Sequence, residues 1–203
     1  MIVGGYPDGK ITEIIDVENS AFSCTKVQSF PVTLLGASGG LIGGQTPFIC
    51  GGQASINGID WFYSKDCYKP TNNGSWTKDK TASLNTRRNY AGYGSVVLND
   101  KLVISGGSNG NHLHSIEMLS PHMQTKTLSV QLPAGFHSHC QVPLDLEKFI
   151  VIGGSLIGSI GVRRRDESYF IDVKTNDEMV DNIMNWWILA HVFDSEQSTR
   201  YNT

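Results

Sequence analysis

A short apolar strand followed by two glycines occurs four times in this chain, and it constrains the fold more than any other feature. The pairs are Gly4-Gly5, Gly51-Gly52, Gly106-Gly107 and Gly153-Gly154, whose first glycines lie 47, 55 and 47 residues apart. A polar stretch and then a second strand follow each pair, at residues 12–18, 66–70, 115–119 and 168–174. Units of about 50 residues built from strands are typical of β-propeller blades. The alternative is a glycine-rich β-sandwich with coincidental doublets, but four copies at this spacing favour the propeller.

Composition agrees with this all-β interpretation and excludes two classes of function. Charged residues make up only 17% of the 203 residues, while glycine occupies 22 positions, which favours tight turns and strands over long solvated helices. The net charge of −3 provides no basic surface, so we expect no nucleic-acid binding. The densest apolar stretch, residues 183–193, is shorter than the roughly 18 residues of a membrane span, so none is expected.

In its second unit the chain resembles the kelch repeat family. Residues 67–76 are similar to the family's Tyr-x-Pro…Asn-x-x-Trp run, with Tyr68 and Trp76 at the two ends, and Arg88 follows where the family often has a basic residue. The resemblance covers residues 1–176 and is weaker in the third unit, which has Met118 in place of the tyrosine. It implies a kelch-type propeller of about four blades, with units near residues 1–34, 35–84, 85–133 and 134–176.

The first unit lacks its innermost strand, because Met1 already lies in the second strand of that blade. Either a C-terminal strand completes this blade or the chain is a fragment of a larger propeller. We favour a fragment, because repeat arrays that expose an unpaired apolar end are poorly soluble. Residues 177–203 do not match the repeat, and residues 186–190 fit a closing strand as well as a short helix.

The longest loops follow the second strand of each blade, and they meet on one face of the disc, where binding is expected. Residues 53–65 form one such loop and contain Trp61, Phe62 and Tyr63, residue types that dominate protein interfaces. The alternative is that these aromatics pack against a neighbouring blade. A second candidate is the run Arg163, Arg164 and Arg165, which could bind carboxylate or phosphate groups of a partner. We place Arg88 on the same face.

Three stretches resemble catalytic or metal-binding motifs, but the residues around each of them do not fit the motif. Residues 36–40 match Gly-x-Ser-x-Gly, but a strand follows where a nucleophile elbow needs a helix. Residues 4–10 almost form a phosphate-binding loop, but Ile11 replaces the Ser or Thr that would bind Mg²⁺. His137 and His139 would share a face of a strand, yet no carboxylate or second thiol lies at ligand spacing. We therefore expect no metal, no cofactor and no enzymatic activity.

Cys50 and Cys67 fall on adjacent antiparallel strands of the second blade, where their Cβ atoms can come within disulfide range. Asn73-Gly74-Ser75 is also an acceptor sequence for N-glycosylation, with Asn73 at a turn. Together they favour an extracellular protein. The same residues also fit a cytoplasmic blade with two buried thiols and a glycosylation sequence that occurs by chance. The sequence therefore does not decide between an extracellular and a cytoplasmic protein.

The sequence thus predicts a non-catalytic protein-interaction module that binds a protein partner through loops on one propeller face. One alternative is a secreted recognition domain for glycan or matrix, held by Cys50–Cys67. Another is the substrate-recognition part of a ubiquitin ligase adaptor, which rests on analogy with kelch proteins alone.

Overall fold

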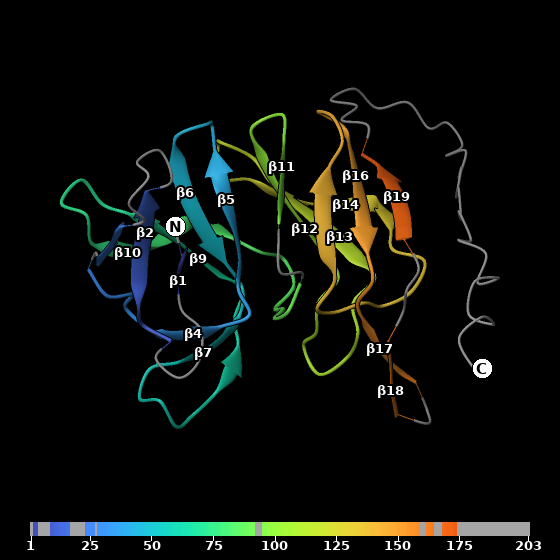
Figure 1. The fold of residues 1–203 in the computed structure, drawn as a ribbon, viewed down its shortest axis with the longest axis horizontal. Helices are drawn as coiled ribbons and strands as arrows, with labels where there is room; N and C mark the ends of the chain where they lie inside the picture. Colours follow the sequence, from blue (N-terminus) through green and yellow to red (C-terminus); the bar gives the residue numbers. More distant parts are fainter. Residues whose placement is uncertain are drawn as a thin grey trace, which may run out of the picture.

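The computed structural model describes residues 2–3, 9–16, 23–26, 28–91, 95–158, 161–164 and 168–173. Within these residues the chain forms antiparallel strands and no helix, so the predicted all-β class is confirmed. It follows that these ranges contain no helix long and apolar enough to cross a membrane. The sheets stand side by side, and several long connections reach the lower edge of the molecule in Figure 1.

Two four-stranded sheets form complete blades, in each of which the antiparallel strands pair in chain order. The second blade contains β5 (Ser38–Ile42), β6 (Thr46–Cys50), β9 (Asp66–Pro70) and β10 (Trp76–Ser83). The third blade contains β11 (Val96–Leu98), β12 (Lys101–Ser105), β13 (Ser115–Leu119) and β14 (Thr125–Gln131). In both blades the glycine pair directly follows the second strand, as the repeat predicts.

Three-stranded sheets lie on either side of these two blades. The first blade contains β1 (Ile2–Val3), β2 (Thr12–Asp16) and β3 (Ser23–Lys26). Among the described residues, this sheet has three strands, in the order β1-β2-β3. The fourth blade contains β15 (Cys140–Pro143), β16 (Lys148–Ile152) and β19 (Ser168–Asp172). Residues 177–203 lie outside the described residues.

Successive blades pack face to face, with the core between them. The innermost strand β11 contacts both β5 and β15, so three blades follow one another around a common axis. Side chains of β12 alternate: Leu102 and Ile104 pack toward the second blade, and Val103 packs toward the fourth. Because both faces of such a strand are buried against neighbouring blades, its side chains must be apolar on both faces. This explains why the strands before the glycine pairs are continuous apolar runs.

The glycine pair Gly106-Gly107 allows the third blade to approach the fourth. Both residues have positive φ, at 61° and 90°. A Cβ at Gly106 would lie 2.5 Å from the Phe136 carbonyl oxygen, and one at Gly107 would lie 2.6 Å from the Asn89 carbonyl oxygen. The Gly107 N–H donates to the Phe136 oxygen at 2.7 Å, and a side chain at Gly106 would push the Phe136 backbone of the fourth unit away. The pairs at residues 51–52 and 153–154 also have positive φ, whereas Gly4 and Gly5 lie outside the described residues.

A ladder of backbone hydrogen bonds connects the starts of three blades. Gly36, Tyr90 and Ser138 occupy equivalent positions and have φ of 59°, 48° and 56°. The Tyr90 N–H donates to the Gly36 oxygen, and the Ser138 N–H donates to the Tyr90 oxygen, both at 2.8 Å. The turn at Ser138 also corrects one expectation: β15 begins only at Cys140, so His137 and His139 do not share a strand face.

Candidate functional site

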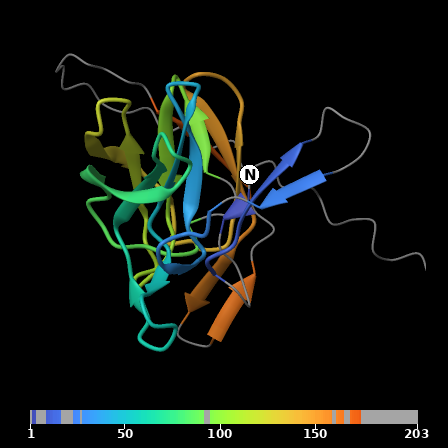
Figure 2. The ribbon, with the colours of Figure 1, turned by 90° about the vertical axis from the view of Figure 1, so that its left-hand side faces the viewer.

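The connections that follow the second strand of each blade share one edge of the molecule. In the second blade this connection contains β7 (Gln53–Ser55) and β8 (Phe62–Tyr63), which extend a small sheet with β4 (Thr33–Leu35). In the fourth blade it contains the hairpin of β17 (Ser155–Gly158) and β18 (Gly161–Arg164). Both connections reach the lower edge in two perpendicular views (Figures 1 and 2).

The tip of loop 53–65 exposes a cluster of large apolar side chains. Ile56 is 74% exposed, Ile59 79%, Trp61 38% and Phe62 42%. Tyr63 is half-buried, and a Cβ built on Gly110 would lie 4.0 Å from its ring, so loop 106–114 is adjacent. We call these four exposed side chains, which lie within the seven positions 56–62, the apolar tip. Trp61 and Phe62 are thus partly exposed, and neither belongs to a core cluster of the described residues.

Hydrogen bonds within the loop give the apolar tip a defined shape. The side-chain oxygen of Asn57 accepts from the backbone N–H groups of Ile59 and Asp60, both at 2.9 Å. Its amide nitrogen donates to Asp60 at 2.7 Å, and the hydroxyl of Ser55 donates to Asn57 at 3.1 Å. A loop that is ordered before it binds loses less conformational entropy on association, which favours affinity.

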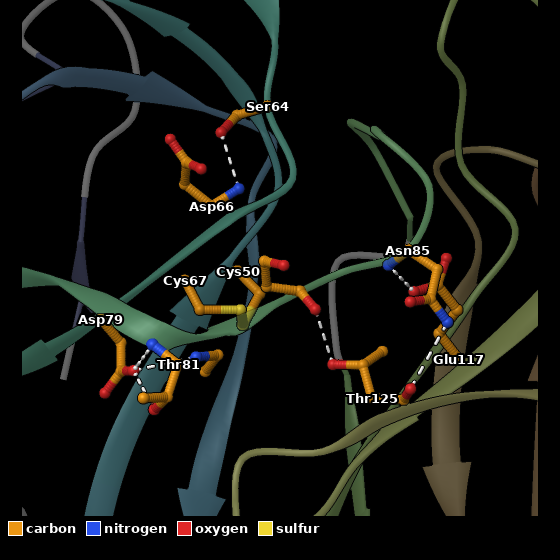
Figure 3. Close-up of a disulfide and its surroundings, with 11 residues drawn as sticks. Cys50, Ser64, Asp66, Cys67, Asp79, Thr81, Asn85, Glu117 and Thr125 are labelled. Carbon is orange, nitrogen blue, oxygen red and sulfur yellow. Dashed lines mark hydrogen bonds between the residues drawn. A yellow bond between two sulfur atoms is a disulfide. The ribbon is translucent and has the colours of Figure 1, made fainter.

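The base of loop 53–65 is closed by a disulfide and by backbone hydrogen bonds. Cys50 and Cys67 are directly opposed on β6 and β9, with their Cα atoms 4.1 Å apart, and they form the predicted disulfide (Figure 3). The Ser64 N–H donates to the Gly52 oxygen at 2.8 Å, and the Arg88 N–H donates to the Ser64 oxygen at 3.1 Å. Both ends of the loop are thus fixed to the scaffold within a few residues of the apolar tip.

Arg88 does not lie on the predicted binding surface, because its side chain is only 1% exposed. It forms an ion pair with Glu117 at 2.5 Å and donates to the Gly106 oxygen at 2.8 Å and to the Ser115 hydroxyl at 2.9 Å. Burial lowers its pKa, and the neighbouring charge of Glu117 opposes that effect. Arg88 therefore holds the connection between the second and third blades and leaves nothing for a partner to contact.

Glu117 is the residue that sequence reasoning missed. Besides pairing with Arg88, it accepts hydrogen bonds from the backbone N–H groups of Asn85 at 2.6 Å and Thr86 at 3.0 Å. Figure 3 shows Asn85 and Glu117 facing each other beside the disulfide. A carboxylate between Ile116 and Met118, in a strand buried on both faces, is the signal that could have identified it.

The remaining predicted residues are placed as follows. Tyr68 and Trp76, which carry the family resemblance, are buried against Phe30 with ring centroids 4.8 and 5.1 Å away. Arg163 and Arg164 lie on β18, at the same edge as the apolar tip, and Arg165 lies outside the described residues. Asn73 is exposed in the turn between β9 and β10.

Three histidines gather where the third and fourth blades meet, yet they do not form a metal site. The rings of His112 and His137 stack with their centroids 5.0 Å apart, and His139 is buried beside Ser105 and Gln141. Burial, then the charge of His137, lowers the pKa of His139 to about 4. Among the described residues, no group of three or more His, Cys, Asp or Glu side chains could hold a metal ion.

The buried His139 predicts a pH dependence of stability. Its pKa is about 4 in the folded protein and about 6.5 in an unfolded chain, so between these values only the unfolded chain binds the proton. The stability that neutral His139 provides is complete above pH 6.5 and is lost as the pH falls toward 4. We expect His139→Gln to remove up to about 1.4 kcal/mol per pH unit from the slope of the unfolding free energy in this range. Urea unfolding at several pH values measures it. The exposed His122→Gln is the control, and equal slopes in both variants would contradict the prediction.

Comparisons with known proteins agree with this architecture. A model of the kelch motif matches residues 89–125, in the third unit and not in the second unit where the resemblance was expected to be strongest. Among solved structures 136 chains match, including the structure of YjhT, at a TM-score of 0.63 and 18% sequence identity. The match covers 80% of this chain and 56% of the YjhT chain, so this chain spans little more than half of that protein. No curated protein matches the sequence. The resemblance to kelch repeats and the propeller fold are both confirmed.

Proposed function

From a kelch motif on a propeller fold, we propose that the chain is a non-catalytic interaction module that binds a protein partner through the apolar tip of loop 53–65. The observation that carries the proposal is the exposure of Ile56, Ile59, Trp61 and Phe62 together on one internally hydrogen-bonded loop. Apolar side chains gathered at one exposed place are typical of interaction sites, and Trp is enriched among residues that dominate binding energy.

The residues around the apolar tip fit a protein partner whose contact surface contains both apolar and polar groups. Asp60 and Lys65 flank the aromatic residues, so a polar rim surrounds an apolar centre, as in many protein interfaces. Loop 106–114 lies next to Tyr63 and would extend the contact surface. The β17–β18 hairpin, with Arg163 and Arg164, shares the same edge and is proposed as a second contact that favours acidic groups.

Substitution of residues in the apolar tip tests this proposal. The purified chain, the double variant Trp61→Ala/Phe62→Ala and the control Leu41→Ala are immobilised, and proteins retained from extracts of the cells of origin are quantified. Leu41 is 50% exposed and lies at the far end of β5 from the glycine-pair edge, so its removal leaves the proposed site intact.

We expect at least one protein that the wild type and the Leu41→Ala variant retain equally and that the double variant retains at least tenfold less. Tenfold corresponds to about 1.4 kcal/mol, a modest loss for two interface aromatics. A set of retained proteins that is the same for all three chains would contradict the proposal.

A further inference from the structure

The turn between β9 and β10 contains the one Asn-x-Ser/Thr sequence of the 203 residues, Asn73-Gly74-Ser75. Asn73 and Gly74 are exposed, and a Cβ built on Gly74 would meet nothing within 4 Å. The turn is held by the Thr71 N–H, which donates to the Ser75 oxygen at 2.7 Å, and by the Gly74 N–H, which donates to the Thr71 oxygen at 2.9 Å. There is therefore open space around a fixed asparagine.

The Asn73 side chain is held in the turn through its carboxamide oxygen. The Ser75 hydroxyl donates to the Asn73 carboxamide oxygen at 2.6 Å, and the Ser75 N–H donates to the same oxygen at 3.2 Å. The Thr71 hydroxyl donates to this oxygen as well. All three bonds use the oxygen, and among the described residues no hydrogen bond uses the amide nitrogen Nδ2, which is the atom that would be modified.

The same β-hairpin carries an independent sign of an oxidising compartment. Cys67 lies on β9, in the hairpin that ends at Asn73, and it is bonded to Cys50. Disulfides of this structural kind persist in secreted proteins and are rare in the cytosol. The secretory pathway that permits this bond is also the compartment in which eukaryotic cells attach N-linked glycans.

We propose that Asn73 is the acceptor of an N-linked glycan, added in the compartment where the Cys50–Cys67 disulfide forms. The donor is a lipid-linked diphospho-oligosaccharide. The Asn73 nitrogen forms a bond to the anomeric carbon of the sugar and loses one proton, while the bond from that carbon to the diphosphate oxygen breaks and its electron pair leaves with the lipid diphosphate.

A glycan at Asn73 leaves the proposed binding loop free. β9 starts at Asp66, beside loop 53–65, and ends at Pro70, beside the turn of Asn73. Five residues of strand separate the two ends by about 17 Å. This inference does not depend on the proposed partner binding, because its test measures only the chemical state of Asn73 and of the two cysteines.

The full chain, directed into the secretory pathway of a eukaryotic cell by an added leader, tests the site. Wild type and the matched control Asn72→Gln are expected to show a single shift in mobility that peptide N-glycosidase removes, with Asn73 converted to Asp in the mass spectrum. Asn73→Gln and Ser75→Ala lose the shift, and Ser75→Thr keeps it, which separates loss of the site from misfolding.

The protein isolated from its own cells provides the decisive comparison. We expect it to be sensitive to the glycosidase and to have Cys50 and Cys67 resistant to alkylation before reduction. An unmodified Asn73, either in the endogenous protein or in leader-directed wild type whose disulfide has formed, would overturn the inference. A shift that persists in Asn73→Gln would overturn the assignment to this residue.

Discussion

Replacing Glu117 with glutamine is expected to lower the free energy of unfolding by roughly 3–5 kcal/mol, the usual cost of removing one partner from a buried ion pair. Arg88 and Glu117 are 1% and 0% exposed, so the arginine that remains would be a charge without a counter-ion in the interior. Glu117 also accepts from the Asn85 and Thr86 N–H groups, and the glutamine amide can replace only part of that acceptance. Urea unfolding, with the midpoint and slope compared to wild type, measures the loss.

Two further variants test whether the loss of stability comes from the burial of the Arg88–Glu117 charges. Asp145→Asn removes the partner of Lys148 in a pair whose side chains are 50% and 37% exposed, so it should change stability by less than about 1 kcal/mol. The double variant Arg88→Met/Glu117→Leu replaces both charges with apolar groups but leaves the Asn85 and Thr86 N–H groups without their acceptor, so we expect it to recover only part of the loss. If Glu117→Gln lowers the free energy of unfolding no more than Asp145→Asn does, the buried ion pair does not stabilise the fold.

Removing the disulfide is expected to cost roughly 3 kcal/mol, because it releases a closed loop of 17 residues in the unfolded chain. The variant Cys50→Ala/Cys67→Ala tests this, and reduction of the wild type should give a similar loss without any change of side chain. Since Gly52 and Ser64 also close the loop by hydrogen bonds, we expect loop 53–65 to remain folded at neutral pH but to be cleaved faster by proteases.

Cys140 provides the matched control for this loss. It is a free, exposed cysteine on β15, and Cys140→Ser should change stability by less than about 0.5 kcal/mol. Equal stability of the double alanine variant and the wild type under oxidising conditions would contradict a stabilising role for the bond.

The repeat allowed much of the fold to be predicted from the sequence. The strands expected at residues 66–70 and 115–119 have those bounds in the structure, because each is a run of side chains between a polar loop and a turn. The Cys50–Cys67 pair followed from the strand register, since antiparallel neighbours fix which residues face each other.

The failures came from contacts between residues that are distant in sequence. Arg88 was assigned to the binding face because it lies in the connection from the second to the third unit, and its partner Glu117 is 29 residues further along the chain. His137 and His139 were expected on one strand face, but the turn at Ser138, where the hydrogen-bonded ladder to Tyr90 ends, lies between them. The ion pair joins the connection before the third blade to strand β13 of that blade, and the ladder joins residues of three units.

The kelch motif was recognised in a different unit from the one expected. The second unit carries Tyr68 and Trp76, yet the family model matches residues 89–125. In the third unit Met118 is buried on β13 opposite Val103 and Lys126, so an apolar residue fills the place of the expected tyrosine. An apolar side chain of suitable volume can therefore fill this buried position without an aromatic ring.

Hydrogen exchange of the chain with and without its captured partner tests most directly whether loop 53–65 is the binding site. The account predicts that protection increases in residues 53–65, with a smaller increase in residues 106–114, and that the turns at residues 71–75 and 120–124 do not change. Protection confined to those turns or to the outer strands β10 and β14, with loop 53–65 unchanged, would contradict it.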